Sequence, residues 1–295
     1  MEKVLEINQL NKSYGKILAI NDISFTVNRG EVYGLLGPNG SGKTTTLAVV
    51  MGILNANAGN YKWFDKPMDK FTRRRIGSLI ETPNFYPYLS LWENLKIVAK
   101  IKDAPDDDIN YALGVANLLK RKHSAYNTLS LGMKQRLAIA SVLVGNPEVL
   151  VLDEPTNGLD PEGFAEVRNI IQSQANEGKT IILASHILDE VEKVCSHVAI
   201  LKSGDLIANG RVGELLTTDD MVYVQTYNME ELDQILEQAD FVKNSFKMDD
   251  DLAVVLDSGY SATDLNKYCF EKGITLSKVL LKKQSLEDQF LQLVK

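Results

Sequence analysis

The sequence predicts an α/β protein in which a largely parallel sheet has helices on both faces, followed by a small α+β domain. Three buried-strand patterns support this fold class, at residues 31–36, 149–152 and 180–185. A helical pattern follows each of them. Strands that alternate with helices are typical of parallel sheets, because neighbouring parallel strands need a crossover connection between them.

Composition excludes several classes of protein. The chain has 295 residues, of which 44% are hydrophobic and 24% charged, with only 8 prolines, so it is globular rather than disordered. Its apolar runs are far shorter than the roughly 20 residues that cross a bilayer, and its N-terminus lacks the pattern of a secretion signal. We therefore expect a cytosolic chain. Cys195 and Cys269 have no metal-like spacing and are expected to be packed thiols.

Charge is distributed unevenly along the chain. Residues 1–218 carry 24 basic and 24 acidic side chains, whereas residues 219–295 carry 8 and 15, so the net charge of -7 lies in the last quarter. This composition predicts two domains with a boundary at residue 218. An acidic domain argues against binding to a phosphate backbone, so no nucleic-acid partner is expected.

The first domain is expected to open with short strands, since residues 1–30 alternate apolar and polar side chains between turn residues. A helical insert is expected at about residues 85–145, with helices at 91–101 and 109–119. After the strand at 149–152, Asp160 and Pro161 suit the start of a helix and Gly178 suits its end. The later elements are a strand at 180–185, a helix at 188–195 and strands at 198–201 and 206–208.

The last 77 residues change character, with short strand-like and helix-like segments in alternation. This pattern predicts a small α+β domain. Strands are expected at 222–225, 252–256 and 275–281, and helices at 229–238, 262–272 and 285–293.

Residues 37–44, GPNGSGKT, match the phosphate-loop pattern GxxxxGK[ST]. Glycines let successive backbone N–H groups converge on phosphate oxygens, and the following helix presents its positive end. Lys43 is expected to reach the β and γ phosphates and Thr44 to hold Mg²⁺. The residues expected to contact the nucleotide are Gly37, Asn39, Gly40, Ser41, Gly42, Lys43, Thr44 and Thr45.

A second group of candidate residues follows the apolar strand at 149–152. Asp153 and Glu154 come at its carboxyl end, the edge where ligands bind in open α/β sheets. Asp153 is expected to hold Mg²⁺, and Glu154 to act as the general base that activates water. Two adjacent acids at a strand end are as often structural, but the phosphate loop earlier in the chain favours the catalytic interpretation.

These motifs and four further matches together resemble the nucleotide-binding domain of ABC transporters. The octapeptide at 129–136, LSLGMKQR, is similar to the family signature LSGGQ, and residues 157–160 look like the D-loop. The resemblance implies an ATPase fold with ATP and Mg²⁺ as ligands. It also implies a catalytic role for His186 at the γ phosphate and adenine stacking on Tyr14. Each of these two residues also has a simpler interpretation. His186 is then an ordinary polar residue at the end of a strand, and Tyr14 is an aromatic residue in a turn.

The resemblance further implies a head-to-tail dimer, in which Ser130 and Gly132 contact the nucleotide held by the opposite subunit. Leu131 and Met133 depart from the signature, yet the helix N-terminus that faces phosphate is expected to persist. Glu81 stands where most family members have a glutamine. A carboxylate only accepts hydrogen bonds and adds negative charge near the γ phosphate, so we expect Glu81 to support hydrolysis and to contact Mg²⁺.

The loop around Glu81 and the ending SLEDQFLQL narrow the resemblance to the ATPases of bacitracin-resistance and lantibiotic-immunity exporters. The expected function is ATP hydrolysis that drives a separate membrane permease from its cytoplasmic face, with a second copy or a close paralogue as partner. An ABC ATPase acting on ribosomes or DNA is the alternative, although such proteins usually carry two cores or long coiled coils. A metabolic kinase is disfavoured by the signature motif.

Overall fold

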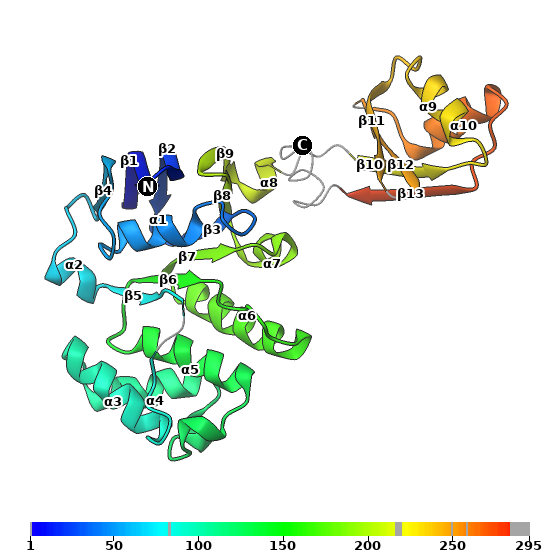
Figure 1. Ribbon diagram of the computed structural model, residues 1–295. Helices are drawn as coiled ribbons and strands as arrows, with labels where there is room; N and C mark the ends of the chain where they lie inside the picture. Colours follow the sequence, from blue (N-terminus) through cyan, green and yellow to red (C-terminus); the bar gives the residue numbers. More distant parts are fainter. Residues whose placement is uncertain (1, 82–83, 216–219, 249, 258, 284–295) are drawn as a thin grey trace. The chain divides into compact units, whose positions relative to one another are not determined.

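The computed structural model describes residues 2–81, 84–215, 220–248, 250–257 and 259–283 (Figure 1). The chain divides into two compact units, Met1–Val212 and Gly213–Lys295. The first unit holds two sheets and the second unit one, and each unit has its own hydrophobic core. The boundary expected at residue 218 and the helix expected at 285–293 lie outside the described residues.

The first unit is built on a six-stranded sheet with the strand order β5-β6-β7-β3-β8-β9. Neighbouring strands run parallel except for β9, which pairs antiparallel with β8. This order confirms the largely parallel sheet that the sequence predicts. The strands are β3 (Val32–Leu36), β5 (Ile76–Leu79), β6 (Val149–Asp153), β7 (Thr180–Ser185), β8 (His197–Lys202) and β9 (Asp205–Arg211).

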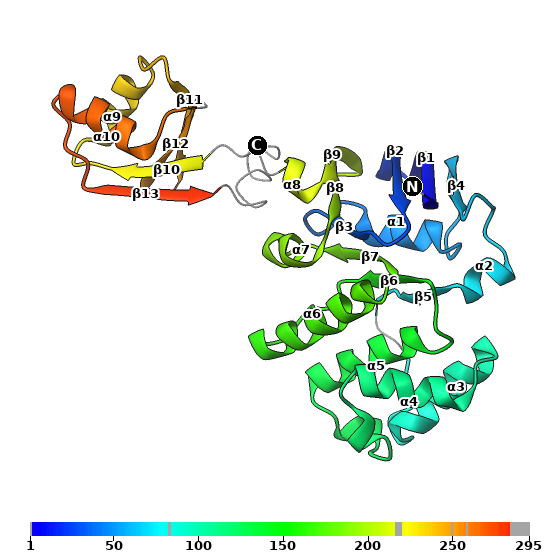
Figure 2. The same cartoon turned by 180° about the vertical axis from the view of Figure 1, so that it is seen from behind.

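Helices lie on both faces of this sheet (Figures 1 and 2). α1 (Lys43–Val50) lies on the side of the N-terminal strands, whereas α6 (Pro161–Asn176) lies on the opposite side. α6 begins where the sequence predicts, because the side chain of its N-cap Asp160 accepts the backbone N–H of Gly163 at 2.9 Å. The shorter helices of this unit are α2 (Lys70–Arg74) and α7 (Leu188–Val194), and α8 (Val212–Leu215) begins at its last residue.

An antiparallel sheet with the order β2-β1-β4 accompanies α1; its strands are β1 (Lys3–Tyr14), β2 (Ile17–Asn28) and β4 (Ala58–Trp63). The expectation of several short strands is wrong, since β1 and β2 each run for 12 residues. Pairing continues through irregularities near Gln9 and Asp22, which adopt φ of 48°. Such bulges bend a strand without ending it. The buried side of this sheet shares one core with α1 and the central sheet.

The segment between β5 and β6 is helical, as expected. It contains α3 (Leu91–Lys102), α4 (Asp106–Val115) and α5 (Leu131–Leu143), with 3-10 turns η1 (Leu119–Arg121) and η2 (Tyr126–Thr128). α4 starts before the predicted range 109–119 because three aspartates occupy its first turn, where they complement the positive end of the helix. It ends earlier because Asn117 takes a left-handed conformation, with φ of 54°.

The second unit holds a four-stranded antiparallel sheet with the order β11-β12-β10-β13. Its strands are β10 (Asp220–Gln225), β11 (Val242–Met248), β12 (Asp251–Leu256) and β13 (Lys278–Lys283), and its helices are α9 (Met229–Leu236) and α10 (Ala262–Glu271). Apolar residues of both helices and the sheet, such as Val222, Leu232 and Leu265, form the core. β11 was not predicted, because polar residues interrupt its alternation and its side chains are at most half-buried.

Candidate active site

The phosphate loop lies between β3 and α1, at the carboxyl end of a central strand. Gly42 has φ of +105°, and a Cβ atom added there would meet the Ala19 carbonyl oxygen at 2.3 Å. Only glycine therefore allows the loop to lie against β2. The same hairpin of β1 and β2 carries Tyr14, whose side chain is 47% exposed and has the Lys12 ammonium 5.4 Å from its ring centroid.

Lys43 folds back over the loop. Its buried Nζ donates to the carbonyl oxygens of Gly37 at 2.9 Å and Pro38 at 3.2 Å. The Ser41 hydroxyl is buried and has no hydrogen-bond partner in the described part of the chain. Buried hydroxyls are usually hydrogen-bonded, so this group fits a site that takes an oxygen-rich ligand such as a phosphate.

Asp153 ends β6 on the same side of the strand as Val149 and Val151, whose side chains belong to the core shared with α1. Its Oδ1 atom is buried without a hydrogen-bond partner among the described residues. Burial raises the pKa of this carboxyl, against an opposing hydrogen bond with Thr44. A buried carboxylate oxygen next to a hydroxyl is a suitable ligand set for Mg²⁺.

Glu154 is held between two basic side chains. Its Oε1 lies 3.3 Å from Lys43 Nζ, and its Oε2 lies 2.8 Å from His186 Nδ1, at the end of β7. Its φ of 46° is unusual for a residue with a side chain, a strain of the kind that clusters at functional sites. The structure thus brings together three distant segments of the sequence, which carry Lys43 and Thr44, Asp153 and Glu154, and His186.

Glu81 follows β5 and also has a left-handed conformation, with φ of 58°. Its backbone forms a hydrogen bond that lowers the pKa of Asp153, although burial of Asp153 outweighs this effect. The Glu81 side chain itself is exposed. The structure therefore places the Glu81 backbone beside the expected Mg²⁺ ligand and leaves its carboxylate in solvent.

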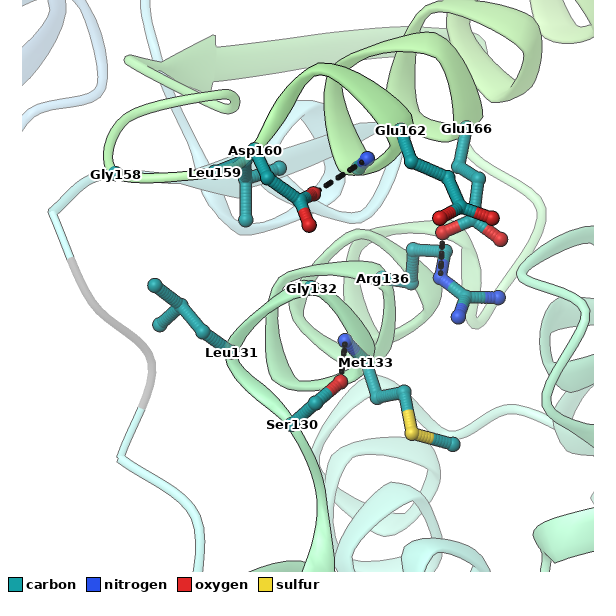
Figure 3. Close-up of a pocket in the computed structure, with 11 residues that line it drawn as sticks. Ser130, Leu131, Gly132, Met133, Arg136, Gly158, Leu159, Asp160, Glu162 and Glu166 are labelled. Carbon is teal, nitrogen blue, oxygen red and sulfur yellow. Dashed lines mark hydrogen bonds and ion pairs between the residues drawn. The ribbon is translucent and has the colours of Figure 1, made fainter.

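Ser130 and Gly132 lie at the N-terminus of α5, where the Ser130 hydroxyl oxygen accepts the backbone N–H of Met133 at 3.4 Å. They line a cavity of about 420 Å³ between α5 and the start of α6 (Figure 3). No residue of the phosphate loop lines this cavity, nor do Asp153, Glu154 or His186. The candidate nucleotide contacts thus fall into two separate groups within one chain.

Sequence reasoning missed the pair that joins the walls of this cavity. Arg136 of α5 forms an ion pair with Glu166 of α6 at 3.1 Å, and its guanidinium donates to the Ala116 carbonyl oxygen at 3.0 Å. Arg136 closes the octapeptide that resembles the signature, so its position was a signal that could have been followed. Its acidic partner lies 30 residues later, and no local pattern indicates it.

Comparison with known proteins shows the family to which the chain belongs. The family profile described as ABC transporter matches residues 20–157. The bacitracin transport ATP-binding protein BcrA of Bacillus licheniformis is 35% identical over 304 residues, which cover 100% of this chain and 98% of that protein. This chain belongs to the ABC transporter family. The lantibiotic transport ATP-binding protein SrtF of Streptococcus pyogenes is 40% identical and aligns with 69% of this chain and 89% of its own length.

Solved ABC structures have the same fold. The cbiO1 protein of Clostridium perfringens, part of the ABC transporter complex cbiONQ, aligns with a TM-score of 0.67 and 33% identity over 73% of this chain and 91% of its own. The predicted family and fold class are thereby confirmed. As an ABC ATPase the chain binds and hydrolyses ATP, and an action on ribosomes or DNA is not favoured. Across the described residues, no helix is long and apolar enough to cross a membrane.

Proposed function

We propose that this chain drives a separate membrane permease that exports peptide antibiotics or similar amphipathic compounds. The match to BcrA supports this proposal, because it extends over the whole chain, including the C-terminal unit. The chain would act at the cytoplasmic face of the membrane, held there by the permease. Co-purification of the tagged chain from membranes, with the ATPase rate of the complex measured with and without bacitracin, tests the proposal. A complex whose ATPase rate is unaffected by peptides of this class would contradict the proposed substrate.

Hydrolysis is proposed to depend on Glu154. As an ATP molecule binds, Lys43 would leave the Gly37 and Pro38 carbonyl oxygens for the β and γ phosphates, and the Ser41 hydroxyl would gain an acceptor. Glu154 would then take a proton from the attacking water, while His186 keeps the carboxylate oriented. Mg²⁺, held by Thr44 and Asp153, would neutralise charge on the phosphates.

A complete site is proposed to need two subunits. The phosphate loop and the N-terminus of α5 supply complementary groups, yet within one chain no phosphate-loop residue lines the cavity at the N-terminus of α5. In a head-to-tail pair, Ser130 and Gly132 of one subunit would complete the site of the other. A second copy or a close paralogue would serve as that subunit, because each contributes both kinds of surface.

The permease is proposed to dock on α3. A groove of about 590 Å³ runs along this helix between Leu89 and Ile101, with Glu93, Lys96 and Lys100 beside it. Ile97 is 38% exposed and Ile101 77%, which is unusual for two isoleucines on adjacent turns. Apolar side chains with a charged rim are typical of a protein interface.

Replacing Ile101 with glutamate is expected to abolish co-purification of the permease and to leave ATP binding unchanged. A charge in the groove would have to be desolvated on docking. The measurement is the amount of permease retained by the tagged chain in detergent. Ile53→Glu is the matched control, since Ile53 is also exposed, at 62%, but lies outside the groove. Equal retention of permease by both variants would contradict the assignment of this surface.

Glu81 is proposed to assist hydrolysis as a further Mg²⁺ ligand once nucleotide is bound. Glu81→Ala is expected to lower the hydrolysis rate by about tenfold or more, in the range seen for groups that tune a metal site. Glu81→Gln should lower it less, since an amide oxygen can still coordinate the ion. The rate of phosphate release at several Mg²⁺ concentrations measures this. If both variants hydrolyse ATP at the parental rate at every Mg²⁺ concentration, Glu81 is not a Mg²⁺ ligand during hydrolysis.

A further inference from the structure

Lys102, the last residue of α3, is a partly buried amine with no part in the nucleotide chemistry. Its Nζ donates to the carbonyl oxygens of Val144 at 2.8 Å, Val142 at 3.0 Å and Ser141 at 3.4 Å. These carbonyls belong to the end of α5, which has no intrahelical partners for them. A lysine at this end satisfies them and complements the negative end of the helix. Burial lowers the pKa of this amine to about 8.

The same turn of α5 also meets the central sheet. A Cβ atom added to Gly77 of β5 would lie only 2.4 Å from the Val142 carbonyl oxygen, so the two backbones are in direct contact. The chain leaves β5 at Leu79 and returns as α3 at Leu91. The two elements that flank this connection, which carries Glu81, are therefore each fastened to one turn of α5, β5 at Gly77 and α3 at its far end, Lys102.

The opposite end of α5 presents Ser130 and Gly132. A helix of 13 residues is roughly 20 Å long. Turning it by about 6° around its last turn would move Ser130 by about 2 Å, enough to make or break a hydrogen bond. The position of the last turn of α5 thus controls whether Ser130 and Gly132, at the other end of the helix, can reach a phosphate.

We propose that Lys102 is a positioning residue, which ties α5 to α3 and so sets where Ser130 and Gly132 meet the nucleotide of the second subunit. The inference rests on the proposed two-subunit site. It adds a physical link from the α3 groove to the signature end of α5. A displacement of α3 is then passed to α5 through the three hydrogen bonds that Lys102 donates to carbonyl oxygens at the end of α5.

The test uses ATP-dependent dimerisation of the full chain in a Glu154→Gln background, which retains bound ATP. Lys102→Met keeps the length of the side chain and removes its three donors. Binding of a fluorescent ATP analogue to the monomer should stay unchanged, because the phosphate loop is intact. The protein concentration needed for half-maximal dimerisation should rise at least tenfold. Lys102→Arg should recover most of the dimer, because it retains N–H donors.

Lys179→Met is the matched control. Lys179 is buried and, like Lys102, donates to a backbone carbonyl oxygen, that of Pro147 at 3.0 Å, beyond the end of α5. Its loss should leave dimerisation near the parental level. Parental dimerisation of Lys102→Met would overturn the inference, and so would an equal loss in Lys179→Met. A Glu154→Gln protein that stays monomeric with ATP would instead refute the two-subunit site, and the inference with it.

Discussion

Glu154→Gln is expected to bind ATP as tightly as the parent and to hydrolyse it roughly 10²–10⁴-fold more slowly, the usual contribution of a positioned general base. Glutamine has nearly the same shape, and its carbonyl oxygen can still accept from Lys43. It cannot take a proton from water. The two measurements are nucleotide affinity at equilibrium and the rate of phosphate release in a single turnover.

Glu148→Gln is a suitable control, because Glu148 is also ion-paired, with Arg75 and Arg29, but stands outside the Glu154 cluster. It should hydrolyse ATP at the parental rate. A Glu154→Gln protein with the parental rate would show that another group activates the water. A large loss of affinity would show that Glu154 acts mainly in binding.

Asp153→Asn is expected to have opposite effects on activity and on stability. Loss of the carboxylate should raise the Mg²⁺ concentration needed for half-maximal hydrolysis by more than roughly tenfold. The nucleotide-free protein should gain about 1–3 kcal/mol in free energy of unfolding, because a buried and partly unsatisfied charge is removed.

The pH dependence of this stability gain follows from the raised pKa of Asp153. The folded state holds the proton more tightly than the unfolded state, whose pKa is near 3.8. The parent therefore loses stability as pH rises from about 3.8 through the raised value, and asparagine, which does not titrate, avoids that loss. Urea unfolding without nucleotide at pH 7.5 and pH 4.5 should give a larger difference at pH 7.5. A variant that is less stable than the parent at pH 7.5 would contradict this account.

The sequence predicts those parts of the site that local chemistry specifies. The phosphate loop needs glycines at fixed spacing, and an apolar strand delivers Asp153 and Glu154 to the edge of a parallel sheet. The start of α6 was predictable because Asp160 and Pro161 act within one turn. Such signals are contained within a few residues, so they can be recognised without knowledge of the fold.

Contacts between distant segments leave no such signal. The Glu154–His186 and Arg136–Glu166 pairs join residues on different elements, and Lys102 finds its partners about 40 residues later. The length of β1 also escaped prediction, because bulges reset its alternation. These features arise from packing, which periodicity within one segment does not record.

ATP is proposed to be held between the phosphate loop of one subunit and the N-terminus of α5 of another. An experimental structure of the Glu154→Gln protein with ATP and Mg²⁺ tests it most directly. We expect a head-to-tail pair in which the Ser130 hydroxyl and the Gly132 backbone N–H lie within about 3.2 Å of γ-phosphate oxygens bound by the other subunit. A pair in which both groups lie beyond hydrogen-bond distance of every γ-phosphate oxygen would contradict it.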